Sequence, residues 1–357
     1  MIFKKSIKHV LAPQTKFYDS MSADWRPFVM FHHFSNIRSK YCNTDIFGLR
    51  FNNFEENNNN YTSIFDEKIV GNKKKAVLVG NSGPFGEGAT SDQKTVSSYL
   101  SKFSDYHFFN LCGRGFSGYQ EIVHFLLLVK RIKNLERIII VSGVIDSFLP
   151  YYVKDYDDNL VPTLGHDLFL KAMRGSARGW KNKIFKIIFG KVLSEGINWD
   201  RINSLNWKQE LFKKKNNFKN KENNLDPDQN LKDITDRNMM IWSTIAKGMN
   251  VKIDFVLQPI GSWCQKKLSV EEEKIFKEEN KSEMQRIYKY VDRQKYILFK
   301  NILKNCAEKY GINFLDCNEI FNNKRYDKEW IFLSRFHVSD IGSKYMAEEL
   351  VENLSLK

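Results

Sequence analysis

Residues 75–82 read KAVLVGNS, a short apolar run that ends in a glycine-containing turn. A continuous apolar run of this length, bounded by turn residues, is typical of a strand buried on both faces of a parallel sheet. Runs of the same kind follow at residues 106–111 and 137–143, and a helix-like segment precedes each of them. Strands that alternate with single helices predict right-handed crossovers and a parallel sheet.

The alternation continues on both sides of a long interruption. One helix is predicted through Val96, Leu100 and Phe103, because Thr90 to Asp92 offer N-cap side chains. Further helices are predicted over residues 120–132, 234–246, 269–309 and 340–354. Further strands are predicted at 251–257 and 313–316. The pattern predicts an α/β fold: a three-layer α/β/α sandwich with a central parallel sheet and a large helical, basic insertion.

The predicted domain covers residues 75–357, with the insertion at 150–228. Residues 1–74 lack a clear period, and we expect them to form an N-terminal extension. His32 and His33 lie in this extension, but neighbouring residues point in different directions, and no acidic or Cys partner stands at ligand spacing. We interpret the pair as aromatic packing rather than as a metal site.

Charge is concentrated in one segment. The chain has 357 residues, 42% of them hydrophobic, which excludes wholesale disorder, and a net charge of +14. Residues 171–225 hold 14 Lys and Arg against 4 Asp and Glu, so this segment alone carries +10. Three interpretations stay open: a helix resting on an anionic membrane surface, a cap that gathers an anionic glycan, or a solvated basic helix. Nucleic-acid binding is not expected, because no stacking platform or recognition module is visible.

The five cysteines are odd in number and never spaced as CxxC, which argues against a disulfide framework and a zinc site. Neither a run of 18 uncharged apolar residues nor a secretory signal is readable. We therefore expect a cytoplasmic protein without a bound metal, with contact to the inner face of a membrane as an open alternative.

In open α/β sheets, reactive groups gather at the carboxyl ends of the strands. Ser82 follows the first predicted strand in the turn GNSG, whose backbone N–H groups can approach a reacting oxygen. His337 lies in the loop before the last helix, from which it could reach the same sheet edge. A serine on a tight turn with a histidine in reach has the parts of a nucleophile and its base.

Four short blocks in this order resemble the SGNH (GDSL-type) hydrolase family: residues 77–82 with 85–90, residues 110–117, residues 143–146 and residues 337–342. The resemblance covers about residues 76–146 and 251–350 and implies the family's flavodoxin-like sandwich. It also implies that Ser82 is the nucleophile, His337 the general base, and the N–H groups of Ser82 and Gly115 oxyanion donors. No cofactor is implied.

Two positions depart from the family pattern. Ile145 replaces an asparagine whose side chain donates to the oxyanion, and Ser334 replaces the aspartate three residues before the histidine. Loss of one oxyanion donor costs on the order of 10²–10³ in rate. Three rim residues, Arg114, Asp146 and Gln258, are candidate substrate contacts; Arg114 could instead pair with an acid, and Gln258 could simply belong to a turn.

The sequence thus predicts serine-dependent ester hydrolysis or acyl transfer on an O-acylated carbohydrate. The alternative, based on Ile145 and Ser334, is a degenerate domain that binds a glycan, a membrane surface or a protein partner without turnover.

Overall fold

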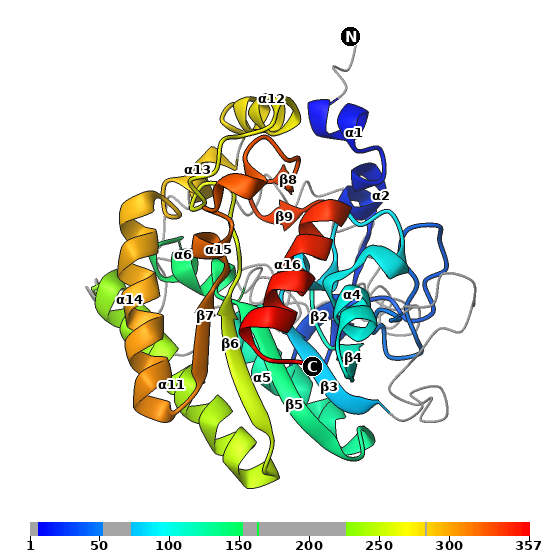
Figure 1. Ribbon diagram of the computed structural model, residues 1–357, viewed down its shortest axis with the longest axis vertical. Coiled ribbons are helices and arrows are strands. Elements are labelled where there is room, and N and C mark those ends of the chain that lie inside the picture. Colours follow the sequence, from blue (N-terminus) through cyan, green and yellow to red (C-terminus); the bar gives the residue numbers. More distant parts are fainter. Residues whose placement is uncertain (1–5, 53–72, 153–162, 164–225, 283) are drawn as a thin grey trace, which may run out of the picture.

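The computed structural model describes residues 6–52, 73–152, 163, 226–282 and 284–357. Its central sheet has five parallel strands in the order β4-β3-β5-β6-β7 (Figure 1). These strands span Tyr106–Asn110 (β4), Lys74–Gly80 (β3), Leu135–Ser142 (β5), Lys252–Leu257 (β6) and Asn313–Asp316 (β7). Counted along the chain, the order is 2-1-3-4-5, which is flavodoxin-like and reverses direction between β3 and β5. The predicted α/β fold with a parallel sheet is confirmed.

Alternate residues of each strand face two separate helical layers. Val77 and Val79 of β3 belong to one core, together with α5 (Gly118–Leu128), α6 (Val144–Tyr152), α11 (Pro227–Met249) and α14 (Arg293–Tyr310). Ala76 and Leu78 belong to the other, with α4 (Val96–Phe103), α12 (Val270–Glu279) and α16 (Asp340–Asn353). Helix α16 crosses in front of the sheet in Figure 1. Because both faces are covered, the strands can carry apolar runs on both faces, as residues 76–79 of β3 and 138–141 of β5 do.

The described part of the N-terminal extension packs on this domain. It contains α1 (Ile7–Leu11), α2 (Thr15–Ser20) and an antiparallel pair formed by β1 (Ala23–Arg26) and β2 (Met30–His33). Tyr18 and Cys42 lie in the core with α4 and α16, whereas Leu49 lies in the opposite core. Residues 6–52 therefore contribute to both cores of the sandwich.

The remaining described elements are short and lie between the larger ones. They are α3 (Ser82–Phe85), α13 (Gln285–Tyr288), α15 (Cys317–Ile320), the antiparallel pair β8 (Phe332–Ser334) and β9 (His337–Val338), and 3-10 turns at Asp92–Lys94, Val129–Arg131 and Lys324–Tyr326.

Two helix predictions need correction. The stretch 269–309 is three helices, α12, α13 and α14, rather than one, and Asp292 caps α14 by accepting a hydrogen bond from the N–H of Lys295. Helix α4 is capped by Thr95, and residues 92–94 form a separate 3-10 turn. In both places a side-chain oxygen satisfies the free N–H groups at the start of a helix.

The basic segment at 171–225 lies outside the described residues, so its predicted role stays a prediction. Within the described ranges, no helix is long and apolar enough to cross a membrane. All five cysteines are buried and free.

Candidate active site

Ser82 lies at the point where the strand order reverses. It is the first residue of α3, directly after β3, and β5 is the neighbouring strand on the side of the reversal. Asn81 caps α3 because its side-chain oxygen accepts the N–H of Gly83 at 3.1 Å. Gly86 ends the helix with φ of 88°, a left-handed conformation that disfavours side chains. In open α/β sheets, ligands bind at such a reversal point, outside the carboxyl ends of the strands.

The structure brings His337 to this serine. Its Nε2 lies 2.9 Å from Oγ of Ser82, although the two residues are 255 positions apart. His337 begins β9, and its side chain is 21% exposed. Burial lowers the pKa of His337 below its usual value, so that the imidazole is neutral at pH 7. A neutral imidazole in hydrogen-bond reach of a hydroxyl can act as its base.

Ser334 occupies the other side of the imidazole. Its Oγ lies 2.9 Å from Nδ1 of His337 and also accepts the backbone N–H groups of Phe336, at 3.3 Å, and His337, at 3.1 Å. A hydroxyl has one hydrogen and two lone pairs. Since two N–H groups already use the lone pairs, the hydroxyl hydrogen is directed to Nδ1. This contact favours the tautomer with the proton on Nε2, whereas a base that accepts from Ser82 needs the proton on Nδ1.

Glu87 and Arg114 form an ion pair beside the imidazole. Nε of Arg114 lies 2.7 Å from Oε2 of Glu87, and the same oxygen lies 3.9 Å from Nε2 of His337. Burial by itself would raise the pKa of Glu87, but the charge and hydrogen bond of Arg114, together with His337, lower it to about 2. Arg114 also donates to the backbone oxygens of Tyr18 and Met21. Its guanidinium therefore pairs with an acid, and contact with substrate stays a prediction.

The predicted oxyanion donors come from two neighbouring turns. The N–H of Ser82 is the first of α3, and the first N–H groups of a helix have no partner within it. Gly115 lies in the turn after β4 with φ of 72°. No described residue accepts a hydrogen bond from its N–H. Ile145, near the start of α6, is buried in the core shared with α11 and α14, so its side chain supplies an apolar contact and no donor.

Gln258 and Asp146 each have hydrogen-bond partners within the protein. Nε2 of Gln258 donates to the backbone oxygen of Phe336 at 2.8 Å, and a Cβ on Gly83 would lie 2.5 Å from the same nitrogen. Gln258 thus fits between the serine turn and the loop of His337. Asp146 accepts the N–H of Gly118 at 3.0 Å, and burial raises the pKa of this carboxyl to about 6. Their contact with substrate stays a prediction.

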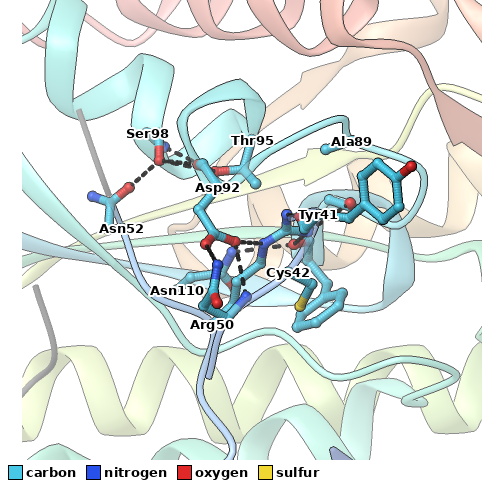
Figure 2. A network of polar contacts seen from close by, with 12 residues as sticks. Tyr41, Cys42, Arg50, Asn52, Ala89, Asp92, Thr95, Ser98 and Asn110 are labelled. Carbon is cyan, nitrogen blue, oxygen red and sulfur yellow. Dashed lines mark hydrogen bonds and ion pairs between the residues drawn. The ribbon is translucent and has the colours of Figure 1, made fainter. Parts of the chain in front are cut away.

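A buried network from the N-terminal extension supports the serine turn (Figure 2). Arg50 donates to Asp92 at 2.8 Å, to the backbone oxygen of Gly86 at 2.7 Å and to that of Tyr41 at 2.6 Å. The side chains of Arg50 and Asp92 are 0% and 3% exposed, respectively. Asn43 donates to the second carboxylate oxygen of Asp92 at 2.6 Å. Arg50 therefore satisfies a carbonyl at the end of the helix that Ser82 begins.

His33 supports the neighbouring turn. Its Nε2 accepts the backbone N–H of Arg114 at 3.2 Å, and its ring stacks on Phe85 with centroids 3.9 Å apart. The ring of His32 lies 4.6 Å from that of His33, so both histidines pack among aromatic rings. Burial lowers the pKa of His33 well below its usual value, which leaves the ring neutral. His33 thus holds the turn that carries Gly115.

Several residues that the sequence analysis did not predict also line the site. A pocket beside His337 is lined by polar and charged side chains from both the extension and the sheet edge, namely Lys8, Thr15, Tyr18, Asp19, Glu87 and Ser334, with Gly88 and Leu333. In the sequence, Glu87 is one residue of the block 85–90, and its position five residues after Ser82 is the signal that could have identified it. No signal marked Lys8 or Asp19. Among the residues described, no group of three or more His, Cys, Asp or Glu side chains could hold a metal ion.

Comparison with known proteins finds likeness only among solved structures. No family model matches the sequence, and no curated protein matches it. The chain is similar to an acetyl xylan esterase (11% identity, TM-score 0.35, covering 78% of this chain and 99% of that one). It is also similar to a lipase/acylhydrolase from Enterococcus faecalis (9% identity, TM-score 0.41, covering 80% of this chain and 97% of that one). A third similar structure is an extracellular lipase from Streptomyces rimosus (10% identity, TM-score 0.38, covering 80% of this chain and 100% of that one). All three TM-scores lie below 0.5, so we base the roles proposed below on the residues and contacts of this chain alone.

Proposed function

We propose that the protein is a serine-dependent esterase or acyltransferase in which Ser82 is the nucleophile and His337 the base. The observation that carries this proposal is the 2.9 Å contact between Oγ of Ser82 and Nε2 of His337 at the reversal point of the sheet. The order of the four sequence blocks supports it, since they bring these two residues and the turn of Gly115 to one edge.

The reaction would begin from the tautomer of His337 that carries its proton on Nδ1: Oγ of Ser82 attacks an acyl carbonyl while the unprotonated Nε2 takes the hydroxyl proton. The carbonyl π electrons move to the oxygen, which the N–H groups of Ser82 and Gly115 stabilise. The intermediate collapses as the bond to the leaving alkoxide breaks, and His337 returns the proton to that oxygen. Water or a second hydroxyl then attacks the acyl-enzyme by the same steps in reverse, and this acceptor alone separates hydrolysis from transfer.

For the substrate we propose a small acyl group, such as acetyl, on a carbohydrate. The pocket beside His337 supports this class, because Lys8, Asp19 and Glu87 line it with charge. Charged side chains suit a ligand rich in hydroxyl groups better than a long acyl chain, which needs apolar surface.

A substrate panel tests the class. We expect the full chain to release acetate from acetylated oligosaccharides, at least tenfold faster than it hydrolyses a palmitoyl ester, and Ser82→Ala to abolish the release. A matched control is Ser20→Ala, an exposed serine whose hydroxyl donates to the backbone oxygen of Phe17 in its own helix. Faster hydrolysis of the palmitoyl ester would contradict the substrate class, and release that persists in Ser82→Ala would contradict the nucleophile.

The second candidate is a domain that binds a glycan without turnover. Two observations favour it: the apolar Ile145 where the family has a donor, and the hydroxyl of Ser334, which favours the wrong tautomer of His337. If the protein is such a binding domain, calorimetry should show binding of an acetylated oligosaccharide, and the wild type should release acetate no faster than Ser82→Ala. Turnover that depends on Ser82 excludes it.

A further inference from the structure

We propose that Glu87 is a positioning residue that takes over part of the role of the missing acid, by holding a negative charge next to the Nε2 side of His337. This inference rests on the proposed function, since it concerns the same serine and histidine. It assigns to Glu87 the stabilisation of the imidazolium that forms when His337 takes the proton of Ser82.

The geometry sets the carboxylate beside the atom that gains the proton. Oε2 of Glu87 lies 3.9 Å from Nε2 of His337, and the side chain of Glu87 is 14% exposed. An opposite charge within about 4–6 Å favours the charged form of a titratable group, and water screens a buried charge less than an exposed one. Glu87 is therefore close enough to stabilise the imidazolium without displacing Ser82, which is the nearer partner at 2.9 Å.

The backbone and Arg114 fix the carboxylate in this place. The N–H of Glu87 donates to the backbone oxygen of Ser82 at 3.1 Å, which closes the turn that carries both residues. Arg114 donates to both oxygens of Glu87, at 2.7 and 3.4 Å. Because Arg114 is itself tied to the backbone of Tyr18 and Met21, it holds the carboxylate in a fixed position.

Four charged side chains act on the imidazole. Lys8 of α1 and Arg114 disfavour the imidazolium, whereas Asp19 of α2 and Glu87 favour it. Lys8 and Asp19 form an ion pair at 2.7 Å, so their effects on His337 oppose each other. On the loop of His337 itself, Arg335 pairs with Glu279 of α12 at 3.5 Å. Glu87 has the largest effect of any charge on the pKa of His337, and it raises that pKa.

This position differs from that of an acid bound to Nδ1. A carboxylate at Nδ1 both orients the ring and stabilises the imidazolium. Glu87 lies on the Nε2 side and can do only the second, while Ser334 holds Nδ1. Because Glu87 stabilises the imidazolium from the Nε2 side, a Ser–His pair could retain part of its activity although position 334 holds a serine.

The test measures the pKa of His337 directly, by titrating the Cε1–H signal of the full chain by NMR and assigning it from its loss in His337→Asn. Glu87→Gln should lower this pKa, because the negative charge is removed while the shape is kept. Glu87→Asp should give an intermediate value. Asp19→Asn, which removes an equal charge from the same pocket, should lower it less, and the exposed Glu348→Gln should leave it unchanged. An unchanged or raised pKa in Glu87→Gln overturns the proposal.

Kinetics supply the second measurement. In Glu87→Gln the rate of acylation at neutral pH should fall roughly 10- to 100-fold, less than the roughly 10⁴-fold loss expected when an orienting acid is removed. The acid limb of its pH profile should move to lower pH, and Glu87→Asp should recover part of the rate. Equal profiles for Glu87→Gln and the wild type overturn the proposal. If the wild type shows no acylation at all, the proposed function fails, while the NMR titration still decides the role of Glu87.

Discussion

Ser334 places its hydroxyl oxygen 2.9 Å from Nδ1 of His337, while two backbone N–H groups already donate to the same oxygen. The base of this site is thus held by a neutral hydroxyl that directs its hydrogen toward the ring. An acid at this place would instead accept the Nδ1 proton and leave Nε2 free to take the proton of Ser82.

Replacement of Ser334 by Asp should therefore raise the activity. The carboxylate would accept from Nδ1 and select the tautomer that a base requires, and we expect acetate release to increase at least tenfold. Initial rates of the wild type and Ser334→Asp, compared at pH 8, measure the effect. An equal or lower rate in a folded variant would show that another group already orients His337.

The pH dependence of the wild type follows from the burial of His337. The imidazole acts as a base only when neutral, and burial lowers its pKa below the usual value of 6.5. Activity should therefore be lost on the acid side only below pH 6.5, and it should be level above it. The rate of acylation as a function of pH measures this limb. A midpoint clearly above 6.5 would contradict the electrostatics of the site.

The ion pair of Arg50 and Asp92 should be needed for stability. Both side chains are almost fully buried, and removal of one partner leaves a buried charge without its counterion. Arg50→Met should lower the free energy of unfolding by about 3–5 kcal/mol. Lys344→Met, which breaks an exposed pair with Glu348 on α16, should change it by less than about 1 kcal/mol. Urea unfolding of both variants makes the comparison, and equal losses would contradict the role given to Arg50.

Asp146 should make stability depend on pH between about 4 and 6. Burial raises the pKa of its carboxyl from 3.8 to about 6, so the folded state binds the proton more tightly than the unfolded state. This contribution is fully present below pH 3.8 and is lost as the pH rises through 6. Relative to Asp146→Asn, the wild type should lose up to about 3 kcal/mol of unfolding free energy over this range. A difference that stays constant from pH 4 to 7 would contradict the shift.

The sheet was predictable because its strands are apolar on both faces. Runs such as residues 75–80 and 137–143 carry their signal locally, and the structure confirms each of them as a strand. The helices at 269–309 were predicted wrongly as one, since their apolar period continues across the breaks. The N-cap side chain of Asp292, which begins a new helix, is the signal that separates α14 from the residues before it.

The site was predictable only in part. Ser82 and His337 stand in short blocks of recognisable order, and the structure places them in contact. Glu87, His33 and Arg50 act through long-range contacts with Arg114, a backbone N–H and a helix-end carbonyl. Such contacts leave no period or spacing in the sequence, because their partners come from separate parts of the fold.

The central claim is that Ser82 is a nucleophile activated by His337. A fluorophosphonate probe that reacts with activated serines, followed by intact-mass measurement and peptide mapping of the full chain, tests it most directly. We predict one adduct, on Ser82, that is absent in Ser82→Ala and His337→Ala and retained in Ser20→Ala. A folded wild-type protein that gains no adduct, or gains one at another residue, would contradict the account.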